Sequence, residues 1–276
     1  MYSHVWMALC AAAQVWWTFM YLDDRSNAAR LITFTFLATV SAYGFMRLMR
    51  AKGALADSVP LFNWVDRNRI WQWIMVAISG SLSIILILPL IGKLIGILWW
   101  IVPICLLYVL PFGYPQRYFG LRAIPALKVP IVGLVWAVVT VIMPATAADV
   151  HFSDRIVLLL FFQRFLFVMA LTIAFDIRDS AIDPPDLRTV PQLFGDRSAR
   201  WIAIGMIVIS ALVSIAFSLL DPDHEYIHLF PLIGMIISAI LLHRTDRSRS
   251  EMYFGFTIDG MLILLPVLAW FGSMLH

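Results

Sequence analysis

Long apolar stretches, separated by short polar or charged segments, recur along the whole chain. Each is about 20 residues long, which is enough for an α-helix to cross the hydrocarbon core of a bilayer. The pattern predicts nine membrane-spanning helices, at residues 4–22, 30–49, 70–92, 94–112, 128–147, 156–178, 201–220, 226–243 and 252–274.

The junctions between these spans predict how the helices connect. The third and fourth spans meet at Gly92 and Lys93, which predicts a tight helical hairpin. Pro103, Pro111 and Pro144 fall in or beside spans, where proline is expected to kink a helix. The chain contains no long linker and no internal repeat, so we expect one all-α bundle of about nine helices, formed by residues 1–276 around a central cavity.

The composition agrees with a membrane protein and excludes other classes. Hydrophobic residues make up 62% of the chain and charged residues only 13%, with a mean hydropathy of +0.87. A soluble domain needs more charge than this to cover its surface. The net charge of +3 is no sign of nucleic-acid binding, because no basic stretch is interleaved with aromatic residues.

The distribution of basic residues predicts the orientation, since cytoplasmic loops of membrane proteins are enriched in Lys and Arg. With the N-terminus in the cytoplasm, the opposite side receives only Arg25, Arg30, Lys93 and Arg155. We therefore expect an integral protein of a bacterial inner membrane with a cytoplasmic N-terminus. The cytoplasmic side then holds 15 of the 20 basic residues: Arg47, Arg50, Lys52, Arg67, Arg69, Arg117, Arg122, Lys128, Arg178, Arg188, Arg197, Arg200, Arg244, Arg247 and Arg249.

The sixth span ends in an acidic segment, FDIRDSAID, at residues 175–183. Asp176, Asp179 and Asp183 are spaced three and four apart, so they share one face of a helix. Three carboxylates this close repel one another unless a cation or the neighbouring arginines compensate them. Such a cluster suits Mg²⁺, which combines a few carboxylates with water and phosphate oxygens. The alternative is a charged helix end that is simply solvated.

The segment FDIRDSAIDPPDLRTVPQLFG, residues 175–195, resembles the second aspartate-rich motif of the UbiA superfamily of membrane prenyltransferases. Asp176, Asp179 and Asp183 match the three Asp positions. Arg188-Thr189 and Gly195 match the basic-Thr pair and the Gly that follow them. The segment YFGFTIDG at residues 253–260 is similar to the Tyr and Asp-Gly of the family's last helix.

This resemblance implies an activity. In the family, the motif binds the diphosphate of an isoprenoid donor through Mg²⁺, and a lipophilic acceptor attacks the allylic carbon. Asp176, Asp179 and Asp183 would then be the metal-binding and catalytic residues, with the isoprenoid tail held in the apolar bundle. Arg178 and Arg188 would pair with the phosphate.

The family's first aspartate-rich motif is missing at the end of the second span. Gly44 and Phe45 stand where Asn and Asp are expected, and three basic residues follow. Three interpretations remain open. Asp57, Asp66 and Asn63 could supply displaced ligands. Arg47, Arg50 and Lys52 could hold the diphosphate directly, because Arg pairs well with phosphate. Otherwise the site is degenerate, and the basic residues mark the cytoplasmic edge.

Two further charged residues lie inside predicted spans. Arg164 is a functional candidate, as any charge within a membrane is, but a structural pairing with a carboxylate or with backbone carbonyls is favoured. Asp259 either lines the head-group end of the cavity and contributes to substrate binding, or forms a hydrogen bond with Tyr43.

The function expected from these features is transfer of an isoprenyl group from its diphosphate to a lipophilic acceptor. A non-enzymatic protein that keeps the fold and binds an isoprenoid lipid is the main alternative. A transporter is less favoured, because the chain lacks paired broken helices in related halves. The expected partners are the donor diphosphate, the acceptor and the bilayer, without nucleic acid.

Overall fold

A computed structural model describes residues 4–50, 67–109, 121, 124, 126–180, 183, 187–222 and 225–275, with the side chains of residues 50 and 109 left undescribed. Within this part of the chain, all regular secondary structure is helical, as predicted. The α-helices are α1 (Val5–Phe19), α2 (Ala28–Arg50), α4 (Arg69–Ile87), α5 (Ile91–Val109), α6 (Lys128–Ala137), α7 (Met143–Ala147), α8 (Arg155–Asp179), α9 (Val190–Leu220), α10 (Glu225–Leu229), α11 (Pro231–His243) and α12 (Asp259–Ser273). The 3₁₀ turn η1 (Leu88–Leu90) and the π-helices η3 (Val138–Ile142) and η6 (Tyr253–Ile258) complete the set.

Among the described residues, seven helical segments are long and apolar enough to cross a membrane. One of them, Arg69–Tyr108, is 40 residues long and contains both α4 and α5, while the apolar helix α1 is shorter than a candidate span. The segments that carry the predicted spans are therefore helical, but the predicted number of nine is not confirmed.

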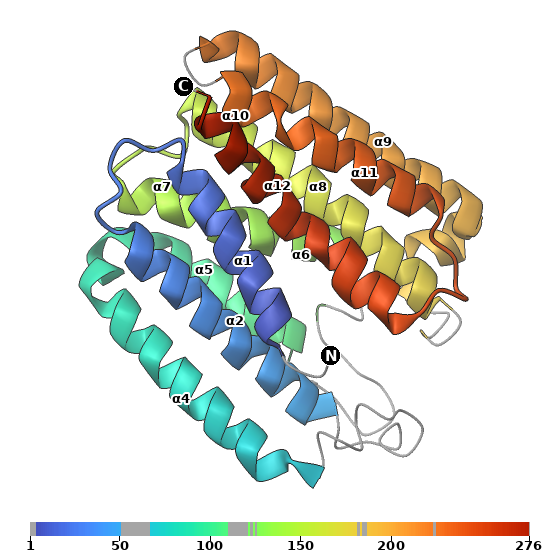
Figure 1. The fold of residues 1–276 in the computed structure, drawn as a ribbon. Helices are drawn as coiled ribbons and strands as arrows, with labels where there is room; N and C mark the ends of the chain where they lie inside the picture. Colours follow the sequence, from blue (N-terminus) through green and yellow to red (C-terminus); the bar gives the residue numbers. More distant parts are fainter. Residues whose placement is uncertain are drawn as a thin grey trace.

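The helices form a bundle in which α1 lies between two groups (Figure 1). On one side α1 packs against α2, which in turn packs along α4. On the other side α1 packs against α12, and α12 contacts α10 and α11, which lie against α9. Helix α8 packs against α6 and α9. The largest buried apolar cluster joins α1, α6, α8, α9, α11 and α12 and fixes the position of α8. The expected central cavity stays a prediction.

The turn of the predicted hairpin lies a few residues earlier than expected. The chain reverses at η1, which contains Pro89, rather than at Gly92 and Lys93 (Figure 1). Proline has no backbone N–H to donate and fits best at the start of a helical segment, so the break falls at Pro89. Pro103 lies inside α5, Pro144 begins α7 directly after η3, and Pro111 lies outside the described residues.

The outer surface of the bundle exposes many large apolar side chains. Trp71, Trp99 and Leu219 are 71%, 80% and 77% exposed. A soluble monomer rarely exposes apolar patches on this scale, whereas a bilayer solvates them. Together with the apolar helices, this surface makes the chain an integral membrane protein.

Arg164 is fully buried within the bundle. Its Nη1 donates to the Gln14 carbonyl at 3.1 Å and to Thr140 Oγ1 at 3.3 Å, and its guanidinium lies 4.4 Å from the centre of the Trp17 ring. The favoured prediction, pairing with a backbone carbonyl, is confirmed. Arg164 therefore joins α8 to α1 and η3.

Candidate functional site

Local sequence signals place the acidic segment at one end of α8. The helix begins at Asp154, whose carboxylate accepts hydrogen bonds from the backbone N–H groups of Ile156 and Val157. It ends at Asp179, and one further backbone hydrogen bond of 2.8 Å, from Asp183 N–H to the Asp179 carbonyl, continues the turn. All three carboxylates therefore lie on or just beyond the last turn of α8.

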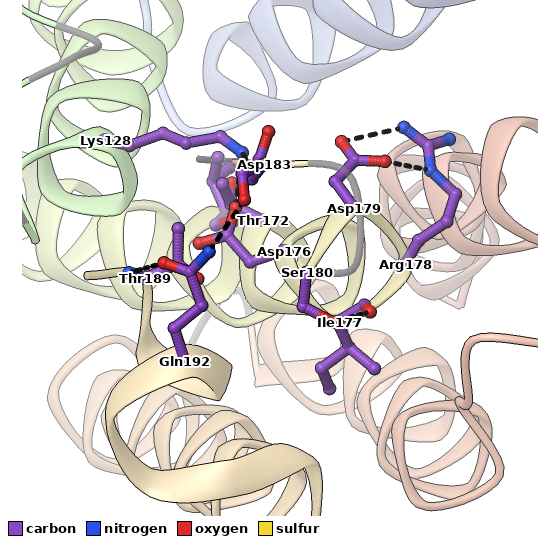
Figure 2. Close-up of polar contacts among 11 residues, drawn as sticks. Lys128, Thr172, Asp176, Ile177, Arg178, Asp179, Ser180, Asp183, Thr189 and Gln192 are labelled. Carbon is purple, nitrogen blue, oxygen red and sulfur yellow. Dashed lines mark hydrogen bonds and ion pairs between the residues drawn. The ribbon is translucent and has the colours of Figure 1, made fainter. Parts of the chain in front are cut away.

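A lysine from another helix reaches two of these carboxylates. Lys128 is the first residue of α6, and its Nζ lies 2.5 Å from Asp176 Oδ1 and 3.5 Å from Asp183 Oδ2 (Figure 2). The pair is shielded from solvent, since the side chains of Lys128 and Asp176 are only 10% and 1% exposed. Asp176 Oδ2 is buried and has no hydrogen-bond partner in the described part of the chain.

The third carboxylate has a different partner. Arg178 binds Asp179 through two hydrogen bonds, Nε to Oδ1 at 2.7 Å and Nη2 to Oδ2 at 3.2 Å, and Figure 2 shows this pair apart from Lys128. The same guanidinium contacts Glu251 at 3.4 Å and lies over the Phe175 and Phe254 rings. Arg178 thus links Asp179 to Glu251, in the segment before the last helix, and Asp179 does not share the cation that binds Asp176.

The predicted cluster of three metal-binding carboxylates does not form. No group of three or more His, Cys, Asp or Glu side chains suited to a metal exists among the described residues. The physical reason is charge compensation: Lys128 neutralises Asp176 and Asp183, and Arg178 neutralises Asp179. The arrangement therefore does not fit a Mg²⁺ ion bound by Asp176, Asp179 and Asp183 together.

A small pocket opens beside the Lys128–Asp176 pair, lined by Ala126, Lys128, Val129, Asp176, Leu187, Thr189 and Val190. Two residues next to it have left-handed backbone conformations, Ala126 with φ 59° and Arg188 with φ 46°. Such conformations cost energy in residues other than glycine and concentrate at functional sites. A hydrogen bond from the Ala126 N–H to the Leu187 carbonyl, 3.3 Å long, joins the two segments.

The residues after the acidic segment shape the start of α9. Thr189 precedes the helix, and its backbone N–H donates to Gln192 Oε1 at 3.0 Å, while Gln192 Nε2 donates to the Asp183 carbonyl at 3.1 Å. Gly195 interrupts α9 with φ 77°, a conformation that only glycine adopts easily. The glycine of the predicted motif therefore has a structural role, which is to bend α9 near the site.

The end of α2, where a first acidic motif was expected, is packed against α1 and α4. A Cβ atom at Gly44 would lie 2.6 Å from Val76 Cγ2 and 3.6 Å from His4 Cδ2, and Phe45 packs edge-on against Trp73. A side chain at position 44, where the family's motif has Asn, would therefore collide with Val76 unless Val76 shifts. The candidate replacement ligands Asn63, Asp57 and Asp66 lie outside the described residues, as do Lys52 and the side chain of Arg50.

The other predicted site residues lie at the same end of the bundle. Arg47 is half-buried on α2, within electrostatic range of Glu251, and Arg188 is exposed. Asp259 is buried at the junction of η6 and α12, within electrostatic range of Tyr43 and Arg178. A π-helix directly before Asp259 is notable because such segments occur frequently at functional sites.

Sequence reasoning missed Lys128 as a site residue. From the sequence, Lys128 is only one of several basic residues in a predicted cytoplasmic loop. In the structure it is buried and forms an ion pair with Asp176 of the acidic segment. The available signal was its position: a lysine that opens an apolar span, at the same end as a set of carboxylates, needs a partner once it is buried.

Comparison with known proteins addresses the fold. No protein-family model and no curated protein matches the chain. Among solved structures, a UbiA homologue from Archaeoglobus fulgidus is 13% identical, with a TM-score of 0.65 over 98% of this chain and 96% of that one. The apo structure of a UbiA homologue from Aeropyrum pernix K1 is 14% identical, with a TM-score of 0.65 over 99% of this chain and 97% of that one.

A second structure of the Archaeoglobus fulgidus homologue holds GPP and Mg²⁺. It is 12% identical to this chain, with a TM-score of 0.64 over 98% of this chain and 96% of that one. The helices and the apolar surface define an integral membrane protein of the helical-bundle class. Within that class, the chain has the UbiA-like fold along nearly its whole length, as the resemblance implied.

Proposed function

We propose that the protein binds an isoprenyl diphosphate and transfers its isoprenyl group to a lipophilic acceptor. The observation that carries this proposal is the buried Lys128–Asp176 pair beside a pocket at one end of a UbiA-like bundle. A solved UbiA homologue with GPP bound supports the class of donor. The apolar helices suit the isoprenoid tail, and the polar end suits the diphosphate.

Basic side chains at this end are available to an anionic head group. Arg47, Lys128, Arg178 and Arg188 come from three different parts of the chain and lie at the same end of the bundle. In the proposed reaction the acceptor forms a bond to the allylic carbon and loses a proton. The bond between that carbon and the diphosphate oxygen breaks, and the diphosphate leaves with the electron pair. Fixed cations stabilise the charge that develops on the leaving group.

No step of this proposal passes through a metal, because the described residues do not fit the predicted Mg²⁺ site. Asp176 Oδ2, which is buried without a hydrogen-bond partner, is the motif oxygen that suits a hydrogen bond from a ligand. We assign Asp176 to ligand orientation and the basic side chains to the diphosphate.

A second candidate function is binding of an isoprenoid lipid without transfer. The observation that favours it is that each carboxylate of the motif already has a basic partner. The two functions differ in one result: both predict donor binding, whereas only the transferase releases diphosphate when a quinone-type or phenolic acceptor is added.

Replacing Arg47 with alanine tests donor binding at this end. The loss of one charge-assisted contact, about 1.5–3 kcal/mol, should weaken binding of a labelled isoprenyl diphosphate by about one to two decades. Arg30→Ala is the matched control, because Arg30 lies on the same helix at its other end, where Nη1 donates to Asn27 Oδ1. Equal donor affinity in Arg47→Ala and Arg30→Ala would remove Arg47 from the site.

We also propose that the end with the Lys128–Asp176 pair faces the cytoplasm of a bacterial cell, with the N-terminus on that side. The support is the predicted excess of basic residues on that side. A reporter fused after Arg249 should then read as cytoplasmic and one fused at His276 as external. The reverse pair of signals would contradict the orientation and place the site away from cytosolic diphosphates.

A further inference from the structure

Asp176 and Asp183 together contact one cation that belongs to the chain itself. Lys128 Nζ lies 2.5 Å from Asp176 and 3.5 Å from Asp183, so the ammonium group bridges two carboxylates seven residues apart. We propose that Lys128 is a tethered cation that takes the place of a divalent metal ion here. In consequence, Asp176 and Asp183 bind no Mg²⁺ of their own.

The geometry makes the ammonium and a metal ion competitors. A Mg²⁺ ion binds carboxylate oxygens at about 2.0–2.1 Å. On Oδ1 of Asp176 it would therefore lie within roughly 5 Å of Lys128 Nζ, and on Oδ2 within roughly 7 Å, where like charges in a buried site repel. The Lys128 side chain is buried at the start of α6, where it lines the pocket.

Two independent features remove the remaining metal ligands. Asp179 is bound through both oxygens to Arg178. On α2, the close approach of Gly44 to Val76 leaves no space for a ligand side chain at position 44 unless Val76 shifts, and Phe45 follows it in place of the expected Asp. Of the three motif carboxylates, only Asp176 and Asp183 keep an oxygen that Lys128 leaves open, and the charge of both is already compensated by Lys128.

The inference extends to the ligand of the site. If the site holds a diphosphate, which rests on the proposed function, then binding of that diphosphate is independent of Mg²⁺ and depends on the basic side chains. The absence of Mg²⁺ binding by Asp176 and Asp183 can be tested without any isoprenyl diphosphate. The two parts are therefore separable by experiment.

The test measures Mn²⁺ binding, as a probe for Mg²⁺, to the purified full-length protein by electron paramagnetic resonance without any diphosphate. We expect no specific binding to the wild type. In Lys128→Met, two carboxylates lose their cation, so the Mn²⁺ affinity should rise by more than roughly tenfold. Lys128→Gln serves as a second variant, because its amide still donates a hydrogen bond to Asp176 but carries no charge.

Lys93→Met is the matched control. Lys93 also forms an ion pair with an aspartate, at 2.6 Å from Asp149, but at an exposed site with a single carboxylate. It should gain no Mn²⁺ affinity. Mn²⁺ binding to the wild type that Asp176→Asn abolishes would overturn the proposal, and so would unchanged Mn²⁺ affinity in both Lys128 variants. Absence of donor binding would refute the proposed function and leave this result unaffected.

Discussion

Replacing Lys128 with methionine should lower the free energy of unfolding by about 3–5 kcal/mol, which is the usual cost of breaking a buried ion pair from one side. Asp176 is 1% exposed, and its only cation among the described residues is Lys128. Methionine fills a similar volume, so the loss reflects the uncompensated carboxylate rather than a cavity. The measurement is denaturant-induced unfolding of the purified protein in detergent.

A double variant separates charge from packing. In Lys128→Met/Asp176→Asn both charges are absent, and part of the lost stability should return, because replacing both members of a buried pair is often close to neutral. Lys93→Met should cost less than about 1 kcal/mol, since its ion pair is exposed. A loss below about 1 kcal/mol in Lys128→Met would show that the buried pair does not stabilise the end of α8.

Placing an aspartate at position 44 should destabilise the protein by about 3 kcal/mol or more. Part of this cost is steric, because the new Cβ atom would lie 2.6 Å from Val76 Cγ2 and overpacking a core costs about 1–3 kcal/mol. The rest is the burial of a carboxylate without a partner. Unfolding in denaturant measures the effect.

Two alanine variants check the steric part of this prediction. Gly44→Ala should cost about 1–3 kcal/mol. Gly96→Ala should be neutral or stabilising by up to about 1 kcal/mol, since no atom lies within 4 Å of its Cβ position and alanine favours helix. If Gly44→Asp were as stable as the wild type, α2 would have room for a polar side chain at position 44, and the steric argument would be wrong.

The helical class and most of the spans could be predicted from the sequence, because a bilayer requires long apolar helices and these dominate the pattern. The boundaries were less accurate where a helix extends beyond its apolar part. Helix α9 begins at Val190 rather than at residue 201. Its first turns contain polar residues, so the apolar pattern does not detect them, and the start of the helix is set by the capping interaction between Thr189 and Gln192. The organisation of residues 1–276 as one domain stays a prediction.

The site was only partly predictable. The change from apolar to charged residues placed the end of α8 to within one residue, because that signal is local, whereas the shared helix face expected from the spacing of Asp176, Asp179 and Asp183 ends with the helix at Asp179. The partners of these carboxylates were not predictable, since Lys128 is far away in the sequence and Arg178 could have turned to any of several acids. The packing of Gly44 against Val76 is likewise a contact between helices, which no local pattern reveals.

Binding of a labelled isoprenyl diphosphate to the wild-type protein tests the central claim most directly, measured with Mg²⁺ and again with a chelator present. We predict saturable binding of equal affinity in both conditions, with release of diphosphate when a quinone-type or phenolic acceptor is added. Binding without release would leave the lipid-binding function. Absence of donor binding in both conditions would contradict the account and leave only the fold.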